Sequence, residues 1–499
     1  MAYRAAVVVN FVMLAGIGMM LQYLARQIFS DEDQKCLSVF ATVAALYPTL
    51  LLYARTTMAE TLLVFLYILA VVLLYQYLES RSMSWLFLLT VVLVYIHFVH
   101  MRTVSLLVAG VVSVVLDRFC FTGDREGIRQ RNHLWYVLVV VVAVVLFVLG
   151  MAARDGIIDH VYEGDSQTFQ INDYRGQIGK LQYIMTWEGF GNLIVSIAGK
   201  VLYLGTATFG IAFWGLWHAW KNAIHGQERK KRVFWCFILL SVTGALMINA
   251  VYTVYPGRVD ALAYGRYHEY VFPVLILAGL YEMWHARRLW RGVFWCAGLE
   301  LCMLVPVLCS LWKYHQTGLH ACMVFGMSYL YDVEKTEPVM FYLESYGFGI
   351  LLMLIVTALL VIGRKEKKRL PIVFLIAAME VILAMRASAV VIDTGSIGAY
   401  RDSVVADKIE ELVQVQMPRK VLFLNSGGDS AIGRIQFLLR DIPIIVLDRQ
   451  RDVDDYSEDE MGLWDLVLTD YRDDHREELS RRYAYALSSG HFILYYNRF

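Results

Sequence analysis

The stretch HLWYVLVVVVAVVLFVLGMA, residues 133–152, contains no Asp, Glu, Lys or Arg. A helix needs about 20 apolar residues to cross a hydrocarbon layer about 30 Å thick. Similar runs recur along most of the chain, whose 499 residues are 58% hydrophobic and only 18% charged. A soluble domain has no need for so many long apolar runs. The sequence therefore predicts an all-α polytopic membrane protein.

Apolar runs suitable for spans occupy the first 390 residues, which we interpret as one transmembrane domain, 1–390. We expect about 12 spans with ends accurate to a few residues, at 5–28, 36–54, 58–78, 83–99, 102–118, 133–152, 200–220, 233–255, 269–286, 293–312, 346–363 and 370–387. The second to fifth lie so close together that the sequence leaves a re-entrant pair open.

The Lys and Arg content of the loops predicts the orientation, because short basic loops stay in the cytoplasm. Four loops are rich in these residues: 117–132, 221–232, 287–291 and 364–369. They alternate with four poorer segments: 153–199, 256–268, 313–345 and the residues after Ala387. We therefore expect the long loops, the C-terminal region and, counting back, Met1 to lie outside.

The C-terminal region is charged and alternates strand-like with helix-like segments. KVLFLN (420–425), IPIIVLD (442–448) and HFILYYN (491–497) are typical of strands, and SAIGRIQFLLRD (430–441) is typical of a helix. This alternation predicts a small extracytoplasmic α/β domain at 391–499. NSGGD (425–429) fits an ordinary Gly-rich turn better than an anion site, and the absence of GxGxxG spacing argues against a nucleotide.

Composition also limits the partners. The basic residues lie in short loops between apolar runs, so no nucleic-acid partner is expected. The seven cysteines form no CxxC pair, which disfavours a metal site or a disulfide framework. The acidic residues of the 153–192 loop show no metal-ligand spacing and are interpreted as solvated charges: Asp155, Asp159, Glu163, Asp165, Asp173 and Glu188. No metal ligand is assigned and no cofactor is certain, although a divalent metal ion stays open.

Ionisable residues at membrane depth suggest function. Glu60 begins the third predicted span, and His97, His100 and Arg102 cluster near the outer ends of the next two. The alternative for these four residues is a snorkelling side chain or a helix–helix hydrogen bond.

The densest polar segment is GRVDALAYGRYHEYVFP, residues 257–273. Arginine binds phosphate in a bidentate manner, and tyrosine offers a flat ring with a hydroxyl group. This mixture suits an anionic lipid head group that carries a sugar. The alternative is a polar loop with an interfacial aromatic belt.

Three stretches give the chain a family resemblance. They are ALYPTLLLYARTTMAETLLVFLYIL (45–69), GKVLYLGTATFGIAFWGLW (199–217) and YGRYHEYVFPVLILAGL (264–280). Together with Arg4, which opens an apolar helix, they resemble the GT-C superfamily of polytopic glycosyltransferases, including protein mannosyltransferase-like and aminoarabinose transferase-like enzymes. The likeness covers most of 1–390 in span order, plus an outward C-terminal domain.

The resemblance implies transfer of a sugar from a polyprenyl-phosphate-linked donor to an acceptor on the outer face, within a cell envelope whose lipids surround the protein. An acidic base would activate the acceptor hydroxyl, and cationic groups would stabilise the leaving lipid phosphate. The expected substrate-binding residues are Glu60, Arg258, Tyr264, Arg266, Tyr267 and Glu269.

One departure from the family bears on activity. GT-C enzymes usually begin with a further span and an outer loop that carries the catalytic acid, whereas this sequence starts where the second span of the family starts. The catalytic residues are therefore unknown, and we expect the chain as given to be truncated or inactive. The alternatives are a transporter or flippase of lipid-linked saccharides, which needs charges deep within its spans, and a non-enzymatic envelope assembly protein.

The loop charges predict a topology that labelling can test. We expect single cysteines introduced near Met1 and near Phe499 to react with a membrane-impermeant thiol reagent in intact cells. Cysteines in 221–232 and 364–369 should react only after the cells are permeabilised. Labelling of 364–369 in intact cells would contradict the orientation.

Overall fold

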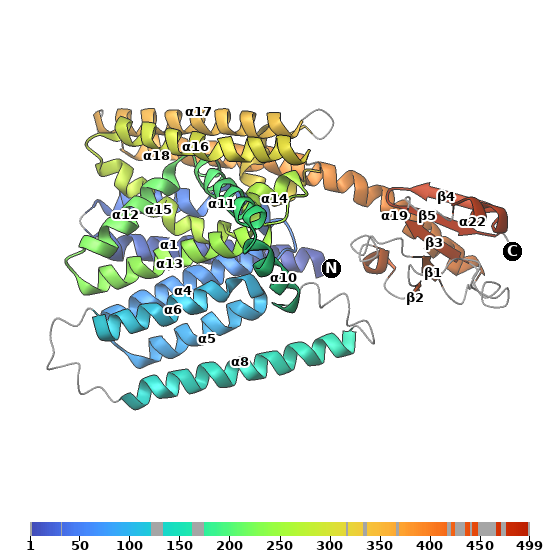
Figure 1. The fold of residues 1–499 in the computed structure, drawn as a ribbon, viewed down its shortest axis with the longest axis horizontal. Helices are drawn as coiled ribbons and strands as arrows, with labels where there is room; N and C mark the ends of the chain where they lie inside the picture. Colours follow the sequence, from blue (N-terminus) through green and yellow to red (C-terminus); the bar gives the residue numbers. More distant parts are fainter. Residues whose placement is uncertain are drawn as a thin grey trace. The chain divides into compact units, whose positions relative to one another are not determined.

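The computed structural model describes residues 2–30, 32–120, 133–161, 174–315, 318–332, 337–365, 369–416, 421–424, 435–439, 442–447, 466–470 and 476–497. The chain forms two compact units, Met1–Val390 and Val391–Phe499 (Figure 1). The predicted Gly-rich turn at 425–429 lies outside the described residues.

The first unit is a bundle of helices. Its first half contains α1 (Ala2–Ile28), α2 (Gln34–Ala45), α3 (Pro48–Ala54), α4 (Glu60–Ser80), α5 (Met83–Val99), the 3₁₀ turn η1 (Met101–Thr103), α6 (Val104–Val115), the π-helical turn η2 (Leu116–Cys120) and α8 (His133–Val161). Its second half contains α10 (Tyr174–Ile184), α11 (Trp187–Ala207), α12 (Ile211–His225), α13 (Arg229–Tyr252), α14 (Val259–Ala263), the 3₁₀ turns η3 (Gly265–Tyr267) and η4 (Glu269–Val271), α15 (Phe272–His285), α16 (Leu289–Tyr314), η5 (Ala321–Met323), η6 (Phe325–Leu330), α17 (Pro338–Lys365) and α18 (Arg369–Ser388).

The helices confirm the predicted fold class. Among the described residues, 8 helices are long and apolar enough to cross a membrane, or 9 if the bent pair α2 and α3 counts as one span. In lipid a backbone segment must satisfy its own hydrogen bonds, and a helix does so within one segment. The chain is therefore an integral membrane protein.

Two predicted spans prove to be broken. The 36–54 span bends by 58° between α2 and α3, where Pro48 starts α3 and cannot donate a backbone hydrogen bond. The 200–220 prediction was wrong in its bounds, because the chain forms α11 and α12 on either side of Phe209 and Gly210, which both have positive φ. Part of the predicted 153–199 loop is therefore helical, as α10 and the start of α11.

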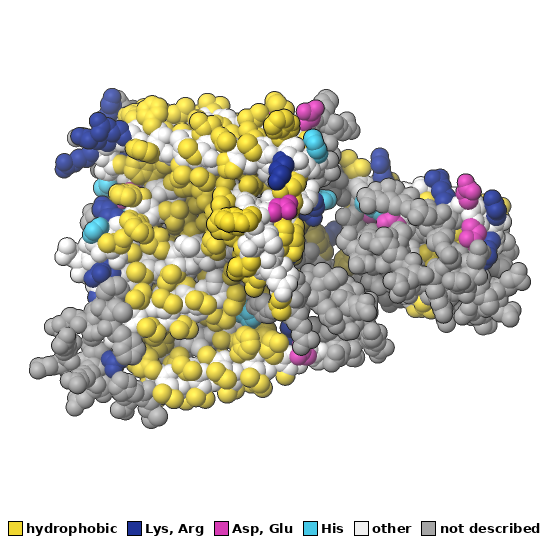
Figure 2. Space-filling model, in the orientation of Figure 1, with side chains coloured by type: hydrophobic (Ala, Val, Ile, Leu, Met, Phe, Trp, Pro, Cys, Tyr) yellow, Lys and Arg dark blue, Asp and Glu magenta, His cyan; other side chains and the backbone are white. Residues whose placement is uncertain are grey.

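The bundle has two chemically different ends. We call one end of the bundle the basic end. Six helices end there: α1, α4, α6, α12, α15 and α17. Charged side chains join these helices to those that begin there. Arg229 pairs with Asp117 at 3.2 Å, and Lys230 pairs with Glu79 at 2.8 Å. Figure 2 shows Lys and Arg side chains gathered at this edge of the bundle. The opposite end, which holds η1, η3 and η4, is called the site end below.

Two glycines let α12 and α15 pack backbone to backbone. A Cβ on Gly215 would lie 2.1 Å from the carbonyl oxygen of Leu275, and a Cβ on Gly279 would lie 2.1 Å from that of Ile211. In lipid the hydrophobic effect does not drive helices together, so their association depends on close packing. Small residues allow that close approach. This reciprocal contact holds α15, and with it the turn that precedes α15, in place.

The second unit contains α19 (Thr394–Gln416), a five-stranded sheet and α22 (Arg476–Arg482). The strands are β1 (Val421–Leu424), β2 (Ile444–Leu447), β3 (Leu466–Asp470), β4 (Tyr485–Ser489) and β5 (Phe492–Tyr496), in the order β2-β1-β3-β5-β4. β1 is parallel to β2 and β3, and β5 is antiparallel to β3 and β4. The predicted strands at 420–425, 442–448 and 491–497 are present, while β4 and α19 were not predicted.

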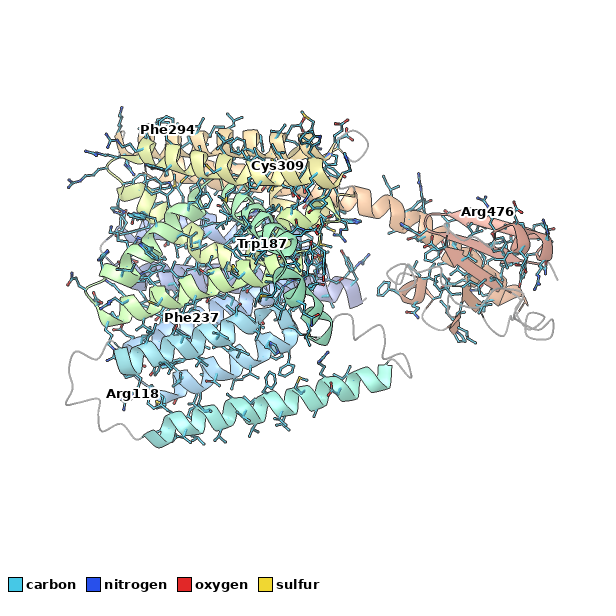
Figure 3. The ribbon with its side chains drawn as sticks, viewed as in Figure 1. Arg118, Trp187, Phe237, Phe294, Cys309 and Arg476 are labelled. Carbon is cyan, nitrogen blue, oxygen red and sulfur yellow. The ribbon has the colours of Figure 1, made fainter. Side chains whose placement is uncertain are left out.

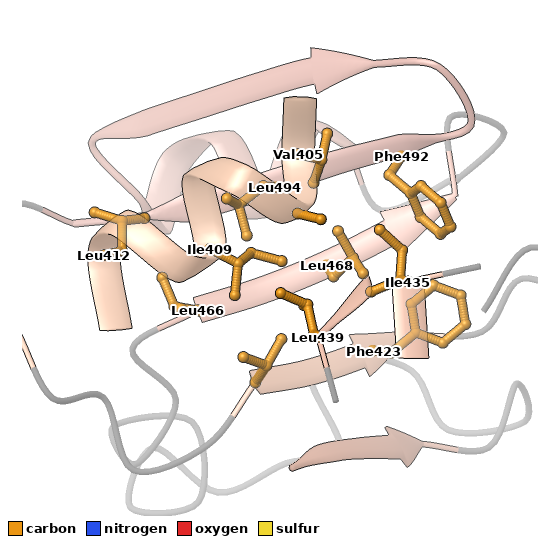
Figure 4. Close-up of a cluster of buried hydrophobic side chains, with 12 residues drawn as sticks. Val405, Ile409, Leu412, Phe423, Ile435, Leu439, Leu466, Leu468, Phe492 and Leu494 are labelled. Carbon is orange, nitrogen blue, oxygen red and sulfur yellow. The ribbon is translucent and has the colours of Figure 1, made fainter. Parts of the chain in front are cut away.

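Side-chain alternation explains the core of this unit. Val421 and Phe423 point to one face of the sheet and belong to the same buried cluster as Ile409 of α19; Figure 4 labels Phe423 and Ile409 in this cluster. Leu422 points to the other face and packs with Leu479 of α22. Helices therefore cover both faces of the sheet.

The glycine contact between α12 and α15 gives a stability prediction. We expect Gly279→Ala to lower the free energy of unfolding by about 1–3 kcal/mol, because the added methyl group must displace the backbone of α12. Gly298→Ala in α16 is the matched control, since nothing lies within 4 Å of its added Cβ. Thermal unfolding of the two detergent-purified variants checks this, and equal melting temperatures would contradict it.

Candidate functional site

The turn between α13 and α15 is shaped by two residues of the YGRYHE segment. Tyr264 adopts a left-handed conformation with φ 36°, which ends α14. Gly265 lies against the Tyr203 ring so closely that a Cβ there would be 1.9 Å from a ring carbon. Only glycine fits this position. Arg266 and Glu269, which follow it, contact different partners.

A buried lysine supports the same turn from α11. Lys200 is fully buried, and its ammonium donates hydrogen bonds to the carbonyl oxygens of Ala261 at 2.6 Å and Leu262 at 2.9 Å. It also donates to Ser196 and Thr253. Sequence analysis missed Lys200, although an ionisable residue inside a predicted span is the signal that could have identified it.

Three charged residues from three segments meet at the site end. The Oε1 atom of Glu60, at the start of α4, lies 2.6 Å from Arg266 Nε and 3.1 Å from Arg102 Nη2. The side chains of Glu60 and Arg102 are 3% and 6% exposed, whereas Arg266 is 22% exposed. One carboxylate faces two guanidinium groups, so this ion cluster carries one net positive charge.

The ion cluster contains polar atoms without a partner. Among the described residues, Arg102 Nε, Arg102 Nη1 and Glu60 Oε2 are buried and make no hydrogen bond. Buried polar groups are nearly always hydrogen-bonded, and an unsatisfied charged donor is costly. Free donors beside an excess positive charge are suited to an anion.

Aromatic side chains surround Arg102. Its guanidinium carbon lies 3.9 Å from the centre of the Tyr267 ring, which also contacts the rings of Tyr264 at 4.4 Å and His100 at 5.6 Å. A guanidinium over an aromatic face is stabilised by the ring quadrupole. Tyr267 therefore lies beside the ion cluster through Arg102, and Tyr264 packs against Tyr267.

Glu269 has a different environment from Glu60. It is fully buried and accepts hydrogen bonds from the hydroxyl groups of Tyr53 and Tyr203. Tyr203 also accepts one from the backbone N–H of Gly326 at 2.9 Å. Glu269 thus joins α3, α11 and η6 within the protein interior.

Arg258 immediately precedes α14. It pairs with Asp260, which is fully buried, while the Arg258 side chain is 44% exposed. Its hydrogen bond to Asp260 raises the pKa of Arg258 above its ordinary value. Cys322 of η5 lies within electrostatic reach of both Arg258 and Arg266, and its own thiol pKa is raised by burial.

The histidines predicted near this end point in different directions. His97 is buried and stacks on Phe147 of α8 with ring centres 5.5 Å apart. His100 accepts a hydrogen bond from the backbone N–H of Arg102. Burial, followed by the charge of Arg102, lowers the pKa of His100 to about 3, so its imidazole is neutral at physiological pH.

No metal-binding group emerges among the described residues: no three His, Cys, Asp or Glu side chains come together in a way that could hold an ion. Of the predicted acidic loop residues, Glu163, Asp165 and Asp173 lie outside the described part of the chain.

Comparison with known proteins gives a fold likeness. No family model matches the sequence, and no curated protein matches it. Among solved structures, the fold is similar to that of ArnT from Cupriavidus metallidurans in the apo state, with a TM-score of 0.50 and 14% sequence identity over 99% of this chain and 83% of that chain. ArnT is an aminoarabinose transferase with the GT-C fold. The chain therefore has an ArnT-like membrane fold, as the resemblance in its sequence led us to expect.

The low pKa of His100 predicts a pH effect on stability. In the unfolded chain histidine takes up a proton below about pH 6.5, whereas folded His100 stays neutral down to about pH 3. Stability is then lost as the pH falls through this window, by about 2 kcal/mol at pH 5 for this residue.

We expect His100→Gln to lose less thermal stability than the parent between pH 7.5 and pH 5. His225→Gln, which changes an exposed histidine at the basic end, should behave as the parent does. Identical pH dependence of the parent and His100→Gln would contradict the assignment.

Proposed function

We propose that this protein is a membrane glycosyltransferase of the GT-C type, which transfers a sugar from a polyprenyl-phosphate-linked donor to an acceptor on the outer face of the membrane. The observation that carries the proposal is the ion cluster of Glu60, Arg102 and Arg266 within an ArnT-like fold.

The charge balance of the cluster favours a phosphate. One carboxylate faces two cations, of which Arg102 is buried and Arg266 is partly exposed, so the cluster has one positive charge in excess. A counter-ion beside this excess charge lowers the free energy of the buried cation. A lipid phosphate at the end of the bundle supplies that charge and accepts hydrogen bonds. Arg266 is the best first contact, because its planar fork is partly exposed whereas Arg102 is buried.

The remaining residues take roles around the phosphate. Arg258 supplies a second, more exposed cation. Tyr264 and Tyr267 offer ring faces and hydroxyl groups to the sugar. Glu269, held by two tyrosines, positions the turn that carries Arg266. During transfer the bond between the anomeric carbon and the phosphate oxygen breaks, the polyprenyl phosphate leaves with the electron pair, and the acceptor oxygen bonds to that carbon as a base takes its proton. No residue of this chain is assigned as that base.

A second candidate function is translocation of a lipid-linked saccharide. Glu300 and Glu380 are buried near the middle of α16 and α18, and charged groups at that depth are typical of transport pathways. Glu300 has a partner in Thr206 at 3.1 Å, which is also what a helix–helix contact requires. The site-end cluster favours surface chemistry over translocation.

Binding of polyprenyl phosphate to purified variants tests the proposed function. Arg266→Ala makes the cluster neutral and removes a charged hydrogen bond worth about 1.5–3 kcal/mol, which corresponds to about a 10- to 150-fold weaker affinity. Arg266→Lys keeps the charge without the planar fork and should recover part of the loss. Affinity is measured in detergent by isothermal titration.

Arg291→Ala is the matched control, because Arg291 is an exposed arginine at the basic end. It should bind as the parent does. Unchanged affinity in folded Arg266→Ala would make Arg266 an interfacial anchor. Phosphate binding accompanied by translocation of a labelled lipid-linked saccharide in vesicles, without sugar transfer to any acceptor, would favour the second candidate.

A further inference from the structure

An apolar groove lies between α5, α6 and α8, away from the ion cluster. Its volume is about 350 Å³, which falls within the range of small-ligand sites. The lining is almost entirely aliphatic and includes Leu89, Leu93, Leu107, Val111, Val140 and Val144. Two residues with polar groups, Arg118 and Tyr136, line its end at the basic side of the bundle, and Figure 3 labels Arg118 beside the start of α8.

The groove is bounded along α8 by two aromatic contacts. At the basic end the hydroxyl groups of Tyr77 and Tyr136 lie 3.2 Å apart. Further along α8, the ring of Phe147 stacks on that of His97. The Phe98 ring packs against Gly150, where an added Cβ would lie 2.3 Å from a ring carbon. α8 therefore touches the bundle at both ends of the groove and leaves a gap between them.

The gap between α8 and helices α5 and α6 has room for an apolar ligand. Only 6% of the apolar window of α8 is buried in the protein, so protein contacts contribute little along the middle of this helix. Apolar cavities stay free of water and accept apolar guests. Between Tyr136 and Val144, the helical rise gives a groove about 12 Å long, which suits the upper part of an extended hydrocarbon chain that enters from the basic end.

We propose that this groove binds one acyl chain of an anionic membrane phospholipid, whose head-group phosphate contacts Arg118. Charge complementarity supports this occupant. The guanidinium of Arg118 lies 5.6 Å from the Tyr136 ring centre, at the mouth of the groove. A basic residue beside a membrane attracts anionic lipids. The bound chain completes the packing of α8.

Photolabelling in nanodiscs tests the proposal. The full-length protein is reconstituted with phosphatidylglycerol that carries a diazirine at mid-chain, and the labelled peptides are mapped by mass spectrometry. We expect labelling of Leu93 and Val144 together. Ala143→Phe and Val140→Phe each place a ring in the groove and should abolish this labelling. Val145→Phe makes the same kind of change outside the lining and should leave it unchanged.

The head group is tested with a second lipid and a competitor. Arg118→Gln should lower the preference for labelled phosphatidylglycerol over labelled phosphatidylcholine about fivefold, which corresponds to about 1 kcal/mol for one basic residue at the membrane surface. Equal labelling in the parent and in both groove-filling variants would show an ordinary lipid annulus and overturn the proposal. Displacement of the label by polyprenyl phosphate would overturn it too, because the groove would then belong to the sugar donor.

Discussion

The carboxylate of Glu60 is the contact on which the arrangement of the site end depends. It joins α4 to η1 through Arg102 and to η3 through Arg266, residues that are far apart in the sequence. Arg102 is buried and needs a counter-charge in this medium of low dielectric, and removing one partner of a buried pair costs more than the pair contributes. Because Glu60 supplies one negative charge to two arginines, one positive charge stays in excess. The contact that holds the site end together therefore also favours an anionic ligand.

The rest of the turn is built to keep this cluster in place. Lys200 holds the end of α14 by two carbonyl groups, Gly265 lets the backbone rest on the Tyr203 ring, and Glu269 ties the start of α15 to two tyrosines. The reciprocal glycine contact packs α15 closely against α12, and α15 follows the turn that carries Arg266. The opposite end carries the basic loops and the mouth of the lipid groove. The proposed contact of Arg266 with the donor phosphate and that of Arg118 with a phospholipid therefore lie at different ends of the bundle.

Sequence reasoning located the helices better than it located their breaks. Long apolar runs specify spans by length alone, and short apolar runs within a charged region specified the strands around Phe423 and Leu494. The break at Phe209 and Gly210 was missed because hydropathy does not record backbone conformation. The segment 257–273 was selected as a candidate site by its density of charges and tyrosines. Arg102 and Glu60 were noted separately, and nothing in their spacing indicated that they meet Arg266.

Composition and periodicity by themselves determined that this chain is a polytopic membrane protein with a small α/β region after its last spans, because burial of apolar side chains and satisfaction of backbone hydrogen bonds depend on local patterns. The identity of the ion cluster was decided only by the tertiary structure. Electrostatic attraction acts through space and not along the chain, so the pairing of Glu60 with Arg266, the burial of Glu269 between two tyrosines and the gap beneath α8 exist only once the helices have packed.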